Sequence, residues 1–160
     1  MIQTESKIKK LPELLQTVAR WKQQGSRIVF TNGCFDIVHL GHIDYLQKSR
    51  NLGNKLIVGV NSDESVRRLK GDSRPVVDEY ARQRMMASFE FVDAVVLFGE
   101  DTPLQLIENI LPDILVKGND YTIENIVGSD IVLGNGGSVE TIELVPGYST
   151  TNLINLIKKL

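Results

Sequence analysis

The stretch that decides the fold is Ile28-Val29-Phe30-Thr31-Asn32-Gly33. Its first four residues are apolar or β-branched and predict a buried strand. Asn32-Gly33 predicts a tight turn, because glycine adopts backbone angles that other residues avoid. A helical spacing of apolar residues follows as far as Leu52, and Gly53 ends it. A strand, a glycine turn and a helix in succession form the first unit of an alternating α/β sheet.

The same alternation extends toward both ends of the chain. Further strands are expected at Lys55–Asn61, Ala94–Phe98, Ile114–Val116 and Val139–Val145. Helices are expected at Ser6–Gln24 (with a true start near Leu11), Ser62–Leu69, Asp78–Phe89, from Thr102-Pro103 onward, at Asp130–Leu133 and at Thr150–Leu160. The segment Lys70–Val77, with a glycine and a proline, is expected to be a loop. Five apolar strands alternating with helices predict a parallel sheet covered on both faces.

Length and composition favour one ordinary globular domain. The chain has 160 residues, of which 42% are hydrophobic and 24% charged. We divide it into an N-terminal helical segment over residues 1–26, packed on the domain, and the α/β domain over residues 27–160. No apolar run approaches the roughly 20 residues of a membrane span, and the N-terminus lacks a secretory apolar region. A cytoplasmic protein without a membrane partner is therefore expected.

The charge and cysteine content exclude further classes. Eighteen basic and 20 acidic residues give a net charge of -2, which argues against general nucleic-acid binding. Cys34 is the one cysteine, so an intramolecular disulfide is impossible. A zinc site made by Cys34, His39 and His42 is an alternative, but this spacing matches no common zinc motif.

The chemistry is expected where the strands end, because parallel sheets bind ligands at the carboxyl ends of their strands. His39 and His42, the two histidines of the chain, follow the first strand and lie three residues apart. On a helix they share one face, near the amino end that favours anions. Gly41 between them allows a backbone or ligand to approach closely. This arrangement predicts a phosphate-binding site.

Three motifs in this order resemble the HxGH nucleotidyltransferase superfamily, which includes the cytidylyltransferases. They are Gly33-Cys34-Phe35-Asp36 with His39-Leu40-Gly41-His42, Lys117-Gly118-Asn119-Asp120, and Tyr148-Ser149-Thr150-Thr151-Asn152-Leu153-Ile154. The resemblance covers roughly residues 27–157. It implies a Rossmann-like three-layer αβα sandwich with a five-stranded parallel sheet of the nucleotidyltransferase type.

Within this superfamily the chain most resembles the D-glycero-β-D-manno-heptose 1-phosphate adenylyltransferase family. The strings that carry this likeness are Val60-Asn61-Ser62-Asp63, Arg68-Leu69-Lys70-Gly71, Arg74-Pro75-Val76, Glu100-Asp101-Thr102-Pro103 and the run from Leu111 to Gly118. The resemblance implies transfer of AMP from ATP to a heptose 1-phosphate, with Mg²⁺ carried mainly by the ATP phosphates. Many members are fused behind a sugar kinase, so a separate kinase is an expected partner here, and a homodimer is the expected assembly.

The resemblance and the local chemistry together nominate site residues. Those expected to act on the reacting phosphates are His39, His42 and Lys70. Those expected to hold the nucleotide are Thr31, Asn32, Gly33, Cys34, Phe35, Gly41, Lys117, Gly118, Asn119, Asp120, Ser149, Thr150 and Thr151. Those expected to bind the second substrate are Asp36, Arg82 and Arg84. No residue is expected to hold a metal directly.

Two other functions stay open on the sequence. A glycerol-3-phosphate cytidylyltransferase would use the same fold and mechanism. Many cytidylyltransferases carry an arginine before the last motif, and Val145-Pro146-Gly147-Tyr148 occupies that stretch here. A nucleotide-binding module without catalysis is the alternative of another class, although both histidines and the Ser149-Thr150-Thr151 run are intact.

Overall fold

The computed structural model describes residues 3–160 and has a five-stranded parallel sheet at its centre. The strands are β1 (Ile28–Gly33), β2 (Lys55–Asn61), β3 (Ala94–Phe98), β4 (Ile114–Gly118) and β5 (Ser138–Ile142). Their order is β3-β2-β1-β4-β5, and every neighbouring pair is parallel. The predicted fold class, a Rossmann-like αβα sandwich on a five-stranded parallel sheet, is confirmed.

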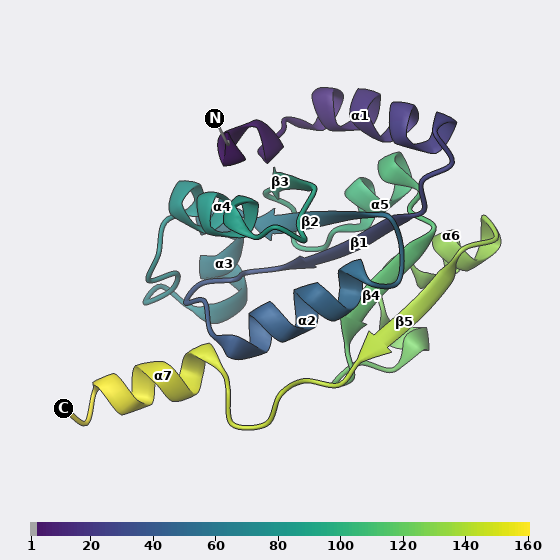
Figure 1. Ribbon diagram of the computed structural model, residues 1–160. Helices are drawn as coiled ribbons and strands as arrows, with labels where there is room; N and C mark the ends of the chain where they lie inside the picture. The colour runs from purple at the N-terminus through teal and green to yellow at the C-terminus, as the bar shows by residue number, and fades with distance from the viewer. Residues whose placement is uncertain (1–2) are drawn as a thin grey trace.

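Helices cover both faces of this sheet (Figure 1). The helices are α1 (Leu11–Gln23), α2 (Leu40–Arg50), α3 (Asp63–Lys70), α4 (Glu79–Ser88), α5 (Leu104–Ile110), α6 (Ser129–Gly134) and α7 (Thr150–Ile157). Two short 3₁₀ turns, η1 (Thr4–Lys7) and η2 (Ile123–Asn125), accompany them. Crossovers between parallel strands are right-handed as a rule, and the strand order reverses at β1, so helices before and after the reversal cover opposite faces.

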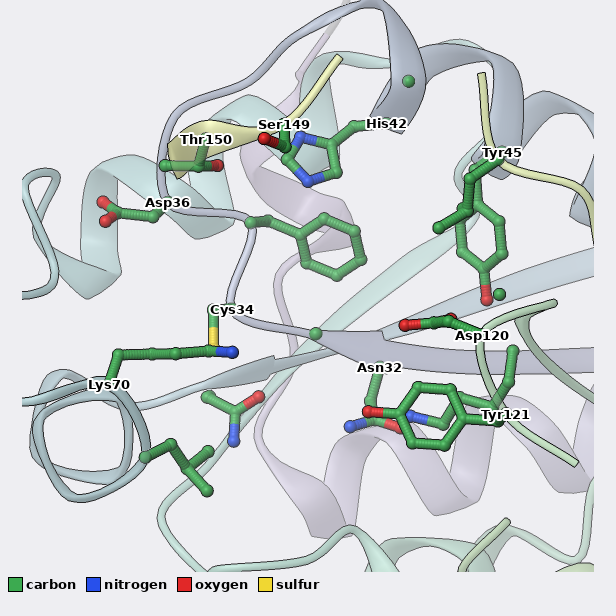
Figure 2. A pocket seen from close by; sticks show the side chains of 18 of the residues that line it. Asn32, Cys34, Asp36, His42, Tyr45, Lys70, Asp120, Tyr121, Ser149 and Thr150 are labelled. Carbon is green, nitrogen blue, oxygen red and sulfur yellow. The ribbon is translucent and has the colours of Figure 1, made fainter. Parts of the chain in front are cut away.

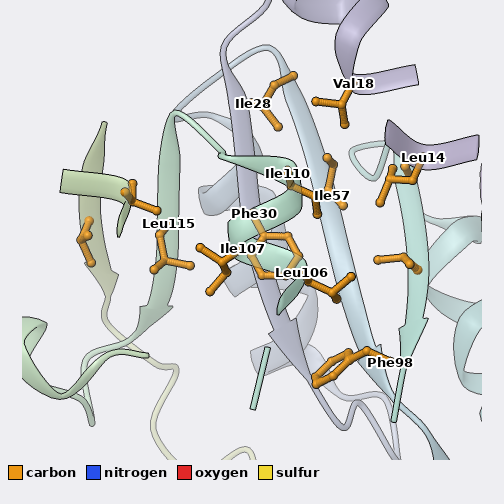
Figure 3. Close-up of a cluster of buried hydrophobic side chains, with 14 of the residues drawn as sticks. Leu14, Val18, Ile28, Phe30, Ile57, Phe98, Leu106, Ile107, Ile110 and Leu115 are labelled. Atoms are coloured by element: carbon orange, nitrogen blue, oxygen red, sulfur yellow. The ribbon is translucent and has the colours of Figure 1, made fainter. Parts of the chain in front are cut away.

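The core has two halves, one on each face of the sheet. On one face, α1, α5 and α6 bury apolar side chains against the strands, among them Leu14 and Ile107 (Figure 3). On the other face, α2 and α4 do the same through residues such as Leu46 and Met86. Each of these four side chains is fully buried. Complete burial of a side chain of this size contributes about 1.5–3 kcal/mol, so the sheet is anchored from both sides.

Polar caps start the helices on the β2 side as the sequence predicts. Ser62 accepts a hydrogen bond from the Ser65 amide at the start of α3, and Asp78 accepts one from the Ala81 amide at the start of α4. Each cap satisfies an amide that the helix leaves unpaired. The helix boundaries near position 62 and position 78 were therefore readable from single residues.

Several predicted boundaries differ from the structure. The first helix begins at Leu11, the start that Pro12 indicates, and residues 6–10 do not join it. Ile8 instead forms an isolated parallel bridge with Val95, so this segment extends β3 laterally before α1 begins. The predicted strand Val139–Val145 ends at Ile142, and the predicted helix to Leu160 ends at Ile157. Pairing with Val95 and with β4 sets the first two boundaries, and local propensity does not report such pairing. The third boundary is the end of a helix in the last residues of the sequence, where helix ends fray.

The last helix differs from the others in how little it buries. A long connection from β5 leads to α7, which lies beyond the helical layers (Figure 1). None of its residues is buried, and Leu156 and Ile157 are 60% and 62% exposed. No helix within residues 3–160 has the length and apolar character needed to cross a bilayer.

Candidate functional site

A cavity of about 620 Å³ opens at the carboxyl ends of the strands. Its lining comes from the ends of β1 and β4, the start of α2, the end of α3 and the residues that lead into α7. The strand order reverses at β1, and such a switch point leaves a crevice between the crossovers that leave in opposite directions. The volume lies in the range typical of small-molecule sites.

The turn after β1 forms the floor of this cavity. Phe35 has a positive φ of 48°, which is unusual for a residue with a side chain, and its ring lies under the turn. A Cβ on Gly33 would come within 3.1 Å of that ring, and one on Gly41 within 3.0 Å of the His39 ring. The two glycines therefore bring the backbone close to the rings that border the cavity.

His39 and His42 lie together at the start of α2. Their rings are stacked with centroids 3.8 Å apart, and Phe35 meets the His42 ring edge-on at 5.3 Å. The Nδ1 atoms of both histidines are buried without a protein partner within residues 3–160. A buried polar atom without a partner costs free energy, so the pair holds unused hydrogen-bonding capacity beside the cavity.

Burial also sets the charge of this pair. Burial, and secondly the neighbouring His39, lowers the pKa of His42 to about 4. Burial lowers the pKa of His39 as well. Both imidazoles are therefore neutral at pH 7, and a neutral imidazole donates one N–H hydrogen bond.

The residues before α7 border the same cavity. Ser149 caps α7 by accepting a hydrogen bond from the Asn152 amide, and Thr150 Oγ1 donates to the Ile37 carbonyl at 3.3 Å. Ser149, Thr150 and Thr151 all line the cavity. In Figure 2, Ser149 and Thr150 are seen on the same side of the cavity as His42. The start of α7 is thus tied to the turn that carries the histidines.

The end of β4 forms the opposite wall. Lys117 donates a hydrogen bond to Asn32 Oδ1, and its ammonium lies 5.8 Å from the Tyr121 ring centre. Burial lowers the pKa of Lys117 to about 8. A Cβ on Gly118 would come within 2.6 Å of Asp120 Oδ1, so glycine allows this carboxylate to fold back over the turn. Lys117, Gly118 and Asp120 line the cavity together with Asn32.

The β2 side contributes Lys70, Asp36 and Arg74 to the lining. Asp36 is only 1% exposed, and its carboxylate accepts hydrogen bonds from Arg74 Nε and from the amides of Val76 and Val77. These bonds outweigh the effect of burial, and the pKa of Asp36 is lowered. The carboxylate is already occupied by the protein, so its observed contacts hold the loop before α4 in place.

Four nominated residues do not reach the cavity. Arg82 is fully buried, and its guanidinium donates to the carbonyls of Cys34 (2.6 Å) and Val77 (2.9 Å) and to Asp63 Oδ1 (2.8 Å). Arg84 lies on the outer surface of α4, where its Nη1 is 3.4 Å from Oε2 of Glu5. Arg82 therefore supports the loop before α4, and Arg84 lies on the surface. Their assignment to substrate binding stays a prediction, and these contacts do not favour it.

Thr31 and Asn119 are the other two nominated residues that do not line the cavity. Thr31 is buried in β1 and shares a hydrogen bond of 2.7 Å with the Tyr45 hydroxyl. Asn119 Oδ1 accepts from the Leu144 amide at 3.4 Å, which links the turn after β4 to the segment after β5. Neither belongs to the cavity lining, so each supports the walls from behind.

The structure also adds residues to the site that the sequence reasoning did not nominate for it. Arg74, Tyr45, Asn61 and Tyr121 line the cavity. Arg74 follows the lysine of the predicted loop by four residues, so a search of that loop for cations would have found it. Tyr45 lies one turn after His42 on α2, and helical spacing would have placed it on the same side.

The carboxylates present do not form a metal cage. No group of three or more histidine, cysteine or acidic side chains is placed to hold a metal ion within the described part of the chain. Of the acidic residues in the lining, Asp36 is paired with Arg74, while Asp101 and Asp120 lie on separate segments. This donor set fits a magnesium ion held mainly by substrate phosphates and water.

Comparison with known proteins adds three findings. The family model described as Cytidylyltransferase-like matches residues 30–155. The chain is 53% identical over 154 residues to the bifunctional protein HldE of Citrifermentans bemidjiense, and 55% identical over 150 residues to that of Rhodospirillum rubrum. These matches cover 96% and 94% of this chain but 32% and 30% of the relatives, so the chain spans about a third of their length.

Two solved structures are also similar. The lipopolysaccharide core biosynthesis protein from Thermoplasma volcanium is 31% identical, with a TM-score of 0.60, over 76% of this chain and 98% of its own. Pantothenate synthetase from Thermus thermophilus has a TM-score of 0.65 at 15% identity over 96% of this chain and 70% of its own, and shares the fold alone. With its parallel sheet, its histidine pair at the switch point and a family match over most of its length, the chain belongs to the cytidylyltransferase-like family.

Proposed function

We propose that this protein transfers AMP from ATP to D-glycero-β-D-manno-heptose 1-phosphate, with release of pyrophosphate and formation of an ADP-heptose. The observation that carries nucleotidyl transfer is the neutral, stacked pair His39 and His42, with unpaired nitrogens, beside a cavity at the switch point. The sugar is supported by identity above 50% to bifunctional HldE proteins across nearly the whole chain.

The reaction needs no nucleophile from the enzyme. An oxygen of the sugar phosphate attacks the α-phosphorus of ATP, the new O–P bond forms, and the bond to the β-phosphate oxygen breaks. Pyrophosphate leaves with that electron pair. The attacking phosphate is already ionised at neutral pH, so catalysis depends on positioning and on donors around the α-phosphate.

The histidine side of the cavity would hold the triphosphate. We propose that His42 donates a hydrogen bond to the α-phosphate and His39 to the neighbouring phosphates, each through the N–H of a neutral imidazole. Ser149, Thr150 and Thr151 add hydroxyls and the amino end of α7, where unpaired amides favour anions. The backbone of Gly33, Cys34, Phe35 and Gly41 lines the same wall, and Lys70 would supply a positive charge.

The β4 side would hold the nucleoside. Asp120 is placed to accept hydrogen bonds from ribose hydroxyls, and Gly118 opens backbone groups to the base. Lys117 and Asn32 form a bonded pair beneath them. In support, Figure 2 shows Asp120 and Tyr121 at one end of the cavity, away from Asp36 and Lys70 at the other.

Further proposals concern the setting of this activity. Mg²⁺ would enter with ATP, bound through the phosphates, and would neutralise charge on the leaving pyrophosphate. The protein would work in the cytoplasm as a homodimer, after a separate kinase that makes the heptose 1-phosphate. We also propose that residues 1–26 form an accessory segment on a nucleotidyltransferase domain of residues 27–160; α1 packs on the core through Leu14 and Val18.

Pyrophosphate release tests this function directly. ATP and CTP are each offered with Mg²⁺ and a panel that includes D-glycero-β-D-manno-heptose 1-phosphate and glycerol 3-phosphate. Release with ATP and the heptose phosphate alone is the expected result. Release with CTP and glycerol 3-phosphate would establish the alternative cytidylyltransferase, and binding of ATP with no release from any pair would establish a non-catalytic module.

A further inference from the structure

Arg74 presents a partly unused guanidinium to the cavity. Its Nε donates to Asp36 Oδ2, and the side chain is 16% exposed. Within residues 3–160, Nη1 and Nη2 of Arg74 have no hydrogen-bond partner, and the residue lines the cavity. Two donors of a planar cation are thus left for a ligand.

The protein holds this guanidinium in place from two directions. Asp36 accepts the Val76 and Val77 amides at 2.8 and 2.9 Å in addition to Arg74 Nε. Arg82, from behind, bridges the carbonyls of Val77 and Cys34. The loop that carries Arg74 is therefore fastened to the turn after β1, and the unused donors of Arg74 keep a defined position relative to that turn.

The location of Arg74 separates it from the nucleoside end. Its partner Asp36 and the neighbouring Lys70 lie at one end of the cavity in Figure 2, with Asp120 and Tyr121 at the other and His42 between them. The chain topology agrees, because the loop of Arg74 follows β2 and Asp120 follows β4, on opposite sides of β1. A ligand at Arg74 would meet the α-phosphate site from the side away from the base.

We infer that Arg74 binds the phosphate of the acceptor, with Nη1 and Nη2 on phosphate oxygens while Nε stays on Asp36. This inference rests on the proposed nucleotidyl transfer. The fork of a guanidinium matches two oxygens of one phosphate, which fixes the orientation of the attacking group as well as its charge. A lysine has one nitrogen and can serve either Asp36 or the phosphate, so arginine is needed at this position.

The test compares Arg74→Lys with wild type in steady-state pyrophosphate release. Loss of charge-assisted bonds worth about 1.5–3 kcal/mol raises the KM for the sugar phosphate by about 10- to 100-fold. The KM for ATP stays within about twofold. Arg67→Ala, which removes an exposed cation of α3 outside the cavity lining, leaves both constants unchanged. Because a lysine can still pair with Asp36, the fold is retained, and thermal melting verifies this.

Three results would overturn the inference. Wild-type constants in Arg74→Lys would make Arg74 an anchor for Asp36 alone. An equal or larger rise in the KM for ATP would move Arg74 to the triphosphate. If wild type turns over no sugar phosphate, the proposed function fails, and Arg74 is tested by calorimetry with inorganic phosphate and α,β-methylene-ATP: binding at least about tenfold weaker in Arg74→Lys supports the inference, and equal binding overturns it.

Discussion

Two sides of the cavity differ in whether their buried polar groups have hydrogen-bond partners in the protein. The β2 side carries Asp36, Arg74 and Arg82, and the histidine side carries His39 and His42. On the β2 side, the buried charges of Asp36 and Arg82 are matched by Arg74, by Asp63 and by backbone groups. On the histidine side, two buried ring nitrogens lack partners within residues 3–160, and the adjoining helix α7 has no buried residue. A closed set of hydrogen bonds gives shape to a site, whereas open capacity is what a ligand uses. Buried charge beside a cavity is therefore a poor guide to substrate contact.

Arg82→Leu is the substitution expected to lower stability most on the β2 side, where the buried charges have partners. Removing one partner of a buried ion pair and orphaning two carbonyls is expected to cost about 3–5 kcal/mol of unfolding free energy. Denaturant unfolding measures this loss. Arg84→Leu, two residues along the same helix, is the matched control and should cost under about 1 kcal/mol, because its pair with Glu5 is on the surface. Equal losses for the two variants would contradict the contrast between the walls.

His42→Ala is the corresponding substitution on the histidine side. We expect it to change the rate of nucleotidyl transfer rather than the stability of the protein. Removal of one donor to the reacting phosphate is expected to lower kcat by about 10²- to 10³-fold. Steady-state pyrophosphate release checks the rate, and circular dichroism checks that the fold is intact. A folded His42→Ala enzyme with near-normal turnover would remove His42 from the assigned role.

The dependence of stability on pH should show that His42 is buried as a neutral group. His42 has a pKa of about 4 in the folded protein, compared with an ordinary value of 6.5. Between pH 4 and pH 6.5 the imidazole is therefore protonated in the unfolded chain but neutral in the folded protein. Stability therefore falls as pH drops from 6.5 toward 4, by about 3 kcal/mol at most from this group. His42→Gln should lose less stability than wild type over this range in denaturant unfolding at pH 7 and pH 4.5. Parallel losses in both proteins would show that His42 is not buried as a neutral group.

Cys34→Ser should have the smallest effect. The Cys34 carbonyl, which serine keeps, accepts the bond from Arg82, and burial raises the pKa of the thiol, so it stays protonated at neutral pH. The chemistry needs no thiolate, so turnover should stay within about threefold of wild type, in contrast to the loss expected from an essential donor. A near-complete loss of activity with an intact fold would assign a chemical role to the side chain.

Much of the fold was predictable from single residues and short runs. Apolar β-branched runs predicted all five strands, and Ser62 and Asp78 marked two helix starts. Ile8 was placed on a helix by its spacing, and the structure pairs it with Val95 instead. An apolar residue at the edge of a pattern fits a helix or a strand equally well, and the neighbouring strand that decides the matter is distant in sequence.

The candidate site was predictable to a different degree. Motifs at strand ends nominated residues such as His39, His42 and Asp120, and the structure brings these to one cavity. Arg82 and Arg84 were nominated because they carry charge, yet α4 turns the first inward and the second toward Glu5. Arg74 was quoted for its likeness to a family but was not nominated for the site, since its place depends on the bond to Asp36, 38 positions away.

The sequence by itself determined the order of strands and helices, the glycines at the end of β1 and the start of α2, and the kinds of groups available at the strand ends. These follow from periodicity, from backbone preferences and from the rule that parallel strands end at one edge. Only the tertiary structure decided which cations face the cavity and which support it. That choice depends on how α4 docks on the sheet and on which carboxylates then lie within hydrogen-bond reach, and neither is encoded in local spacing.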